Sequence, residues 1–202
     1  MANPLLKRAP VAEKHSAEAG FTLVDIMITL LVMGIIMASA IPGFRDFNGA
    51  FRLEQNTREV ERVLQAARLR AVTSNRPIRV RFNCPAAGGY RMVELLGTPL
   101  TPLAEDDGAN RCLTTSYPYP AADRNPMTLP NQDGPAQTLG TGVTFGAAAS
   151  LEFWSDGTVH AQTAAENPWN MVPAAGTAVT LVKGATVKTI KVNGLGKIEL
   201  VR

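Results

Sequence analysis

The feature that most constrains the fold is a run of apolar residues near the N-terminus, at 21–41, which carries a single charge at Asp25. An α-helix needs about 20 apolar residues to cross a hydrocarbon core of roughly 30 Å. The run has 21 residues, so the sequence predicts one membrane-spanning helix. Residues 1–20 carry more basic than acidic side chains, so we expect them to stay cytoplasmic and the rest of the chain to face outward.

Two other interpretations of this segment stay open. An ordinary secretory signal peptide would be cleaved after its apolar part, and Ala38-Ser39-Ala40 has the small residues that such a site needs. The run is longer than an ordinary h-region of about 7–15 residues, which argues against a signal peptide. The second alternative is a plain single-span protein that joins no assembly.

Composition excludes several classes of protein. The formal net charge is +3, with 17 acidic and 20 basic side chains, so bulk charge does not indicate nucleic-acid binding. Cys84 and Cys112, even together with His160, are too few for a four-ligand zinc site. We expect no metal and no other cofactor.

The pattern after the apolar run indicates that the helix continues. Apolar residues recur near helical spacing as far as Val72, and mixed charges occupy the other side. Pro42 removes one backbone hydrogen bond and clashes with the preceding turn, so we expect a kink there. Asn75, Arg76 and Pro77 should end the helix, which we place at 21–75 with its transmembrane half at 21–41.

Beyond Pro77 the helical period is lost, and short alternating segments lie between Gly and Pro residues. Two hairpin turns are indicated, at Ser155-Asp156-Gly157 and at Lys183-Gly184-Ala185. Residues 97–140 are rich in Pro, Gly, Asn and Asp and are expected to form loops rather than core. The fold class is therefore α+β: a long N-terminal helix followed by a mainly antiparallel β-sheet head at 76–202. Strands are expected near 78–82, 90–95, 143–145, 151–153, 158–160, 178–183, 186–192 and 197–201.

The sequence Gly20-Phe21-Thr22-Leu23-Val24-Asp25 resembles the prepilin cleavage site of type IV pilins and type II secretion pseudopilins. The resemblance implies that a membrane peptidase cuts between Gly20 and Phe21, removing a leader at 1–20. It also implies that Phe21 is N-methylated and that the 182-residue mature chain keeps its anchor. Pro42 fits a proline that pilin helices commonly carry, whereas Asp25 stands where the family usually has glutamate.

Asp25 is costly in an apolar segment unless it is paired, so it marks a functional contact. The resemblance suggests that its partner is the terminal amine of Phe21 in a neighbouring subunit of a filament. The alternative is a carboxylate that reaches the membrane interface from a position near the helix end.

Residues 67–78, together with Phe153-Trp154-Ser155-Asp156-Gly157, are similar to the GspH/FimT group of minor pilins and pseudopilins. The resemblance implies a pilin-like subunit of a type IV pilus or related filament, acting in its biogenesis, priming or decoration. A type II secretion pseudopilin for protein export is the alternative. The implied partners are other pilins or pseudopilins, the prepilin peptidase, the inner-membrane assembly platform and the membrane. The implied location is the bacterial inner membrane, single-pass, with the head in the periplasm or at the cell surface and extracellular after assembly.

Cys84 and Cys112 fall in the part expected to face an oxidising compartment, where a disulfide persists. We expect them to pair and to contribute roughly 3–4 kcal/mol by loop entropy. The alternative is two separate buried thiols that act as small hydrophobes.

The sequence does not indicate catalysis. Ser155, Asp156 and His160 are the residue types of a hydrolase triad, but one hairpin cannot easily place all three around one atom. The motifs of serine hydrolases, zinc proteases and P-loop enzymes are also missing from the sequence. We therefore expect a structural protein and not an enzyme.

Nucleic-acid binding is a less favoured hypothesis, because some FimT-type minor pilins capture DNA. Their C-terminal motif is a glycine followed by arginines, whereas this chain has Gly196-Lys197-Ile198-Glu199. Lysine neutralises phosphate but glutamate repels it. The alternative is an ordinary solvated sheet face. The candidate contacts are Arg79, Arg81, Lys191, Lys197 and Arg202.

Overall fold

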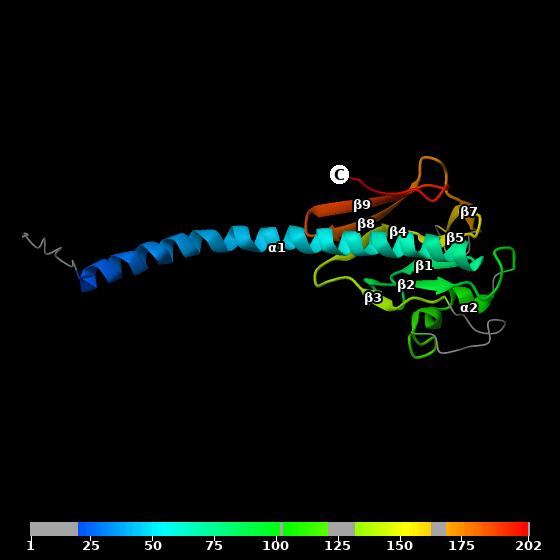
Figure 1. The fold of residues 1–202 in the computed structure, drawn as a ribbon, viewed down its shortest axis with the longest axis horizontal. Helices are drawn as coiled ribbons and strands as arrows, with labels where there is room; N and C mark the ends of the chain where they lie inside the picture. The colour runs from blue at the N-terminus through cyan, green and yellow to red at the C-terminus, as the bar shows by residue number, and fades with distance from the viewer. Residues whose placement is uncertain (1–19, 102, 121–131, 163–168, 202) are drawn as a thin grey trace, which may run out of the picture. The chain divides into compact units, whose positions relative to one another are not determined.

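The computed structural model of the 202-residue chain describes residues 20–101, 103–120, 132–162 and 169–201 (Figure 1). Most of the expected leader, 1–19, and the candidate contact Arg202 lie outside this part. The chain divides into two compact units, Met1–Phe44 and Arg45–Arg202, which are described separately below.

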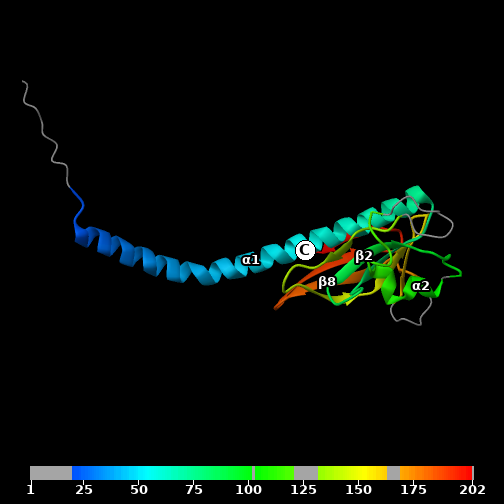
Figure 2. The same cartoon turned by 90° about the horizontal axis from the view of Figure 1, so that it is seen from below.

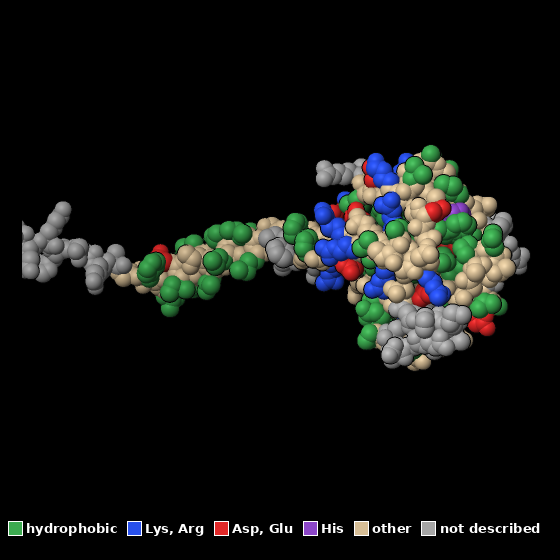
Figure 3. Space-filling view, turned by 45° about the vertical axis from the view of Figure 1, so that its right-hand side comes forward, with side chains coloured by type: hydrophobic (Ala, Val, Ile, Leu, Met, Phe, Trp, Pro, Cys, Tyr) green, Lys and Arg blue, Asp and Glu red, His purple; other side chains and the backbone are tan. Residues whose placement is uncertain are grey.

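The described part of the N-terminal unit is helical from Leu23 onward. Helix α1 spans Leu23–Ser74, close to the predicted 21–75, and its helical backbone continues through Pro42. The expected kink at Pro42 stays a prediction. Side chains from 21 to 39 are exposed, and Figure 3 shows hydrophobic groups along this segment. Among the described residues, no helix combines the length and the hydropathy needed to cross a membrane, so the structure does not confirm the predicted span at 21–41.

In the second unit, one face of α1 is fully buried. Its buried residues follow one another at intervals of four, three, four, three and four positions, as one face of a helix requires. Both sheets lie on the same side of this part of α1 (Figure 2). The α1 residues with no exposed surface are Leu53, Thr57, Val60, Leu64, Ala67 and Ala71.

The larger sheet has six antiparallel strands in the order β3-β2-β1-β5-β6-β7. Strand β1 is Ile78–Phe82, as predicted, while β2 (Gly89–Glu94), β5 (Ser150–Phe153) and β6 (Val159–Gln162) lie within two residues of their predicted positions. Two edge strands were not predicted, β3 (Ala136–Thr138) and β7 (Asn170–Met171). Both are short, and neither has a buried alternating face that would reveal it.

The smaller sheet has four antiparallel strands in the order β10-β9-β8-β4. Its strands are β4 (Thr144–Ala148), β8 (Thr177–Lys183), β9 (Thr186–Val192) and β10 (Ile198–Val201). Lys183 pairs with Thr186, so Gly184 and Ala185 form the predicted hairpin turn. Gly184 has φ of 58°, a left-handed conformation that glycine adopts without strain.

Both sheets contribute to one hydrophobic core beneath α1. Val80 and Phe153 come from the larger sheet, and Leu181 and Ile190 come from the smaller one. All four have no exposed surface. The hairpin predicted at Ser155-Asp156-Gly157 joins β5 to β6.

The segment expected to form loops rather than core is more ordered than its composition suggested. It holds a short helix α2 (Ala104–Asp107) and a 3₁₀ turn η1 (Ala109–Cys112), besides β3. Asp106, Arg111 and Asp133 are almost completely buried in it. The correction has a physical reason, because buried charges look like surface charges in a sequence until their partners are known.

Candidate functional site

The residues at the expected processing site lie at the surface of the N-terminal unit. Phe21 is 88% exposed, and Gly20 precedes it in a segment without regular secondary structure before the helix. The Asp25 carboxylate accepts a hydrogen bond from the Thr22 hydroxyl (2.7 Å) and one from the Thr22 backbone N–H (3.0 Å). In return, the Asp25 N–H donates to the Thr22 hydroxyl oxygen (3.3 Å). This reciprocal pair forms a capping box at the start of α1.

The capping box gives Asp25 a local role that the sequence analysis missed. The signal was present, since Thr followed three positions later by an acid, ahead of an apolar run, is typical of a helix start. The carboxylate is nevertheless exposed in the single subunit. A capping role therefore leaves it accessible to an external cation.

The expected disulfide is present in the second unit. Cys84 lies two residues after β1, and Cys112 ends η1, with the two Cα atoms 5.7 Å apart. Both cysteines are buried. The bond fastens η1 to the end of β1.

Arg79, a candidate nucleic-acid contact, points into the protein and is 1% exposed. Its Nε and Nη2 atoms donate to Glu152 Oε2 (3.0 and 2.8 Å), and its Nη1 donates to Asp107 (2.7 Å). Its guanidinium also lies 4.1 Å from the ring centre of Trp169. Glu152 is fully buried and accepts a further hydrogen bond from the Trp154 indole (2.8 Å).

Arg81, the second arginine of that strand face, is also engaged internally. Its guanidinium donates to the backbone carbonyls of Asp106, Asp107 and Gly108, the shortest at 2.6 Å. Partial burial lowers the pKa of Arg81, and the neighbouring Arg79 adds to this effect. The expectation that Arg79 and Arg81 form a solvent-facing basic pair is therefore corrected, because both bond to α2, and Arg81 also bonds to Gly108 just before η1.

A second buried ion cluster lies beside the first. Arg111 makes two hydrogen bonds to the Asp133 carboxylate and one to the Glu94 carbonyl. Asp133 also accepts from the Glu94 N–H (2.8 Å), and Arg91 donates to the carbonyls of Gly134, Leu113 and Tyr117.

The C-terminal candidate contacts are in a different sheet from Arg79 and Arg81. Lys191 is on β9, where it pairs in register with Glu199. Lys197 lies 2.5 Å from the Glu199 carboxylate, which neutralises it. Among the described candidates, which exclude Arg202, the structure therefore does not bring the basic residues into one patch.

The residue types of a hydrolase triad do not assemble into one. Asp156 accepts hydrogen bonds from the Thr158 N–H (2.9 Å) and hydroxyl (2.7 Å), which lower the Asp156 pKa. The His160 ring stacks on Trp154 with centres 3.7 Å apart, and burial lowers its pKa. No group of side chains suited to holding a metal occurs within the described ranges.

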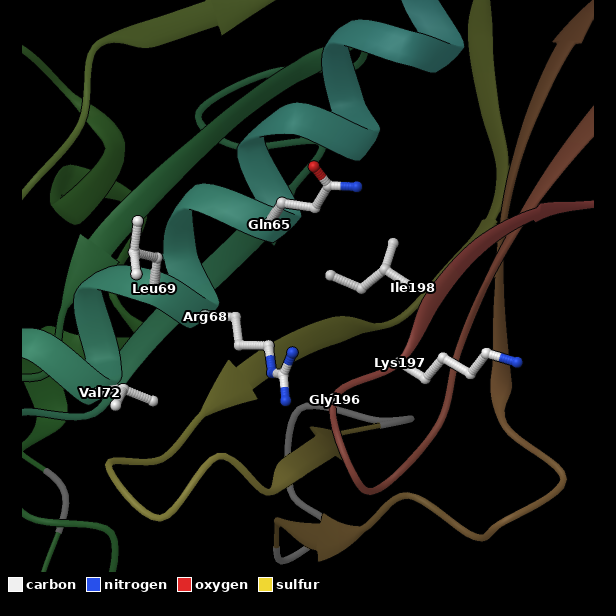
Figure 4. Close-up of a pocket in the computed structure, with 7 residues that line it drawn as sticks. All are labelled: Gln65, Arg68, Leu69, Val72, Gly196, Lys197 and Ile198. Carbon is white, nitrogen blue, oxygen red and sulfur yellow. The ribbon is translucent and has the colours of Figure 1, made fainter.

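A groove that the sequence did not reveal lies between α1 and the start of β10. Its volume is about 570 Å³. Figure 4 shows Ile198 pointing toward α1, Lys197 pointing away from it, and Arg68 directed at Gly196. We call this the Arg68 groove; it is lined by Gln65, Arg68, Leu69, Val72, Gly196, Lys197 and Ile198.

Comparison with known families identifies the chain. The family model described as "Type II transport protein GspH" matches residues 56–196, which is more than half of the sequence. The chain belongs to the GspH family. The matched region covers most of the head and the last part of α1.

Solved structures with similar folds come from two bacteria. The type IV minor pilin FimU of Pseudomonas aeruginosa is 16% identical, with a TM-score of 0.46 over 77% of this chain and 92% of that one. The minor pseudopilin EpsH of the Vibrio cholerae type 2 secretion system is 15% identical, with a TM-score of 0.40 over 74% and 96%. A search of curated protein sequences gave no match. As a GspH-family member, the protein is a subunit of the minor pilin and pseudopilin class.

Proposed function

We propose that this GspH-family protein is a structural subunit that is anchored in the inner membrane and assembled with other pilins into a type IV pilus or related filament. The observation that supports the proposal is the exposed apolar surface of residues 21–39. Such a surface needs a lipid or protein partner, since exposed apolar patches of this size mark interaction sites. The same segment follows the prepilin-type sequence at residues 20–25.

Leader processing follows from the same proposal. A membrane peptidase cleaves between Gly20 and Phe21, and the new terminal amine of Phe21 is methylated. Intact-mass measurement of the purified mature chain tests this directly. The expected mass is that of residues 21–202 with one added methyl group and the disulfide intact. A mature N-terminus at residue 41 or later would instead indicate an ordinary signal peptide and would overturn the proposal.

Asp25 then pairs with the amine of a neighbouring subunit's Phe21 inside the filament. Asp25→Ala should leave cleavage largely intact but reduce incorporation into filaments. The Phe21 amine of the neighbouring subunit would then lie unpaired in an apolar core, which costs roughly 3–5 kcal/mol. Asp25→Glu should be tolerated. Thr29→Ala is a matched control, since the Thr29 hydroxyl bonds only to the Ile26 carbonyl of its own helix (2.9 Å). Normal incorporation of Asp25→Ala would favour a carboxylate that only caps the helix or reaches the interface.

A second candidate role is that of a pseudopilin in type II protein export, favoured by the description of the matched family. The two roles differ in what is lost when the gene is deleted. The absence of surface filaments, or a reduced number of them, supports the pilus role. Retention of secreted enzymes inside the periplasm supports the export role.

We do not propose nucleic-acid capture. Arg79 and Arg81 are committed to internal partners, and Lys197 is neutralised by Glu199. Binding to DNA needs several cations that each neutralise a phosphate. The head is therefore proposed to act through protein contacts, without catalysis and without a cofactor.

A further inference from the structure

Strand β10 has one paired side and one open side. It is the last strand of its sheet and pairs with β9 alone among the described strands. The Asn193 N–H donates to the Lys197 carbonyl (3.0 Å), so residues 197 and 193 form a hydrogen-bonded pair. In an antiparallel ladder the backbone groups of successive residues point to alternate sides. The N–H and carbonyl groups of Ile198 and Leu200 therefore point away from β9, along an open edge.

The Arg68 groove lies at the start of this open edge. Ile198, which contributes to the edge, also lines the groove. Across from it, Leu69 and Val72 of α1 expose 65% and 49% of their surfaces. The groove therefore combines a strand edge that offers backbone donors and acceptors with an apolar wall.

Arg68 is the one charge in the groove that lacks a carboxylate. Its Nη2 makes a single long hydrogen bond, to the Leu195 carbonyl (3.3 Å), and none of the described acidic side chains forms an ion pair with it. The Arg68 side chain lies close against Gly196, since a Cβ added at Gly196 would lie only 2.4 Å from Arg68 Nε. Lys197 forms an exposed ion pair with Glu199, and the two together carry no net charge.

These features suit a peptide better than a nucleic acid. An extended peptide satisfies an open strand edge by adding a strand to it, and side chains on alternate positions then enter the flanking groove. A volume of about 570 Å³ is within the range of about 300–1,000 Å³ typical of binding sites. A phosphate backbone, by contrast, would contact one unpaired cation and an apolar wall, which is a poor match for several negative charges.

We propose that the Arg68 groove binds an extended segment of a neighbouring filament subunit, which adds a strand beside β10 and places a carboxylate against Arg68. The choice of a neighbouring subunit as the source rests on the proposed function. The chemistry of the ligand rests on the groove alone.

The test uses the full mature chain in detergent and three capped eight-residue peptides of alternating threonine and valine. The fifth residue of each peptide is glutamate, glutamine or lysine, and each peptide carries a fluorophore for anisotropy. The glutamate peptide should bind about tenfold more tightly than the glutamine peptide, as expected for a hydrogen bond between charged groups. The lysine peptide should bind most weakly. Hydrogen exchange of the bound protein should slow at residues 198 and 200.

Three variants separate the parts of the proposal. Arg68→Gln should remove the preference for glutamate and leave glutamine-peptide binding unchanged. Leu200→Pro should weaken all three peptides, because it removes an outward N–H that β9 does not use, a position where edge strands accept proline. Arg62→Gln is the matched control, since Arg62 is an exposed arginine of the same helix, paired with Glu59 outside the groove.

Equal binding of the three peptides, or no binding, would overturn the proposal. So would an Arg68-dependent affinity for a 20-base-pair DNA duplex without peptide binding, which would assign the groove to nucleic acid instead. Failure of the filament proposal has a different signature. In that case Asp25 variants and the parent would be equally absent from filaments, while the glutamate peptide still bound at Arg68.

Discussion

The two units of the chain place apolar and charged side chains in opposite environments. In the N-terminal unit, Leu23 and Ile35 are 75% and 64% exposed, and Asp25, the one acidic side chain among the described residues of this unit, bonds to Thr22 at its own helix start. In the second unit, the guanidinium groups of Arg79 and Arg111 are buried with their acidic partners. The second unit therefore pairs these buried charges internally, whereas the N-terminal helix leaves apolar surface for an external partner. Stability and assembly should respond to different substitutions.

The largest expected effect comes from breaking the buried pair of Arg79 and Glu152. Arg79→Ala should lower the free energy of unfolding by roughly 3–5 kcal/mol, because Glu152 keeps its buried charge and retains only the Trp154 indole as a partner. Urea denaturation followed by tryptophan fluorescence measures the loss. Arg58→Ala, which removes an exposed helical pair with Glu54, is the control and should cost less than about 0.5 kcal/mol.

A double substitution sharpens this result. Arg79→Leu with Glu152→Leu removes both charges, and it should be less destabilising than the sum of the two single changes. Additive losses would show that the two groups do not act as a pair.

The second effect concerns the disulfide between Cys84 and Cys112, which have a sequence separation of 28. Replacing both with serine should cost roughly 3–4 kcal/mol, as loop entropy gives for a closed loop of this length. The loss belongs to the head, so the helicity of residues 23–39 should not change. Denaturation with and without reductant provides the comparison. An unchanged midpoint after complete reduction would contradict the expected contribution.

The sequence predicted the helix and strands of the fold far better than it predicted which charged side chains are buried. Helix and strands follow from hydrophobic periodicity, which is local, and β1 and β9 were placed to the residue. Arg79 and Arg81 alternate on a strand as surface residues would. The acidic partners of Arg79, Asp107 and Glu152, are 28 and 73 positions away from it, so only the tertiary structure reveals the pairing.

For the candidate sites, too, the sequence predicted features encoded by neighbouring residues but not those formed by distant ones. The motif at residues 20–25 is contiguous, and it predicted the processing site and marked Asp25 as a functional residue. The Arg68 groove joins α1 to a segment 127 positions later, which no local pattern indicates. The capping box at Thr22 was readable in the sequence, and it was missed because Asp25 had been assigned to a partner outside the chain.

The third prediction tests whether the helix start is energetically separate from the head. Thr22→Val removes the hydroxyl that bonds to Asp25, and loss of such a cap costs about 1 kcal/mol of local helix stability. Hydrogen exchange at residues 23–26 should accelerate in detergent. The unfolding midpoint of the head should stay the same. A lower midpoint would show that the stabilities of the two units are coupled, and it would contradict the expectation that they respond to different substitutions.

The smallest expected effect is a pH dependence carried by His160. Burial lowers the His160 pKa from its ordinary value of 6.5, although the carboxylates of Glu152 and Asp156 act in the opposite direction. The folded protein therefore keeps His160 neutral at a pH where the unfolded chain already binds a proton. Stability from this group is fully present above pH 6.5 and is lost as pH falls from there toward the folded pKa.

His160→Phe keeps a ring against Trp154 and removes the titration. The parent should then lose more stability than the variant between pH 7.5 and pH 5.5, as measured by urea denaturation at each pH. His15, the other histidine, lies in the expected leader and does not interfere in the mature chain. Parallel pH profiles would mean that His160 titrates alike in the folded and unfolded states, and that its buried position on β6 has no electrostatic cost.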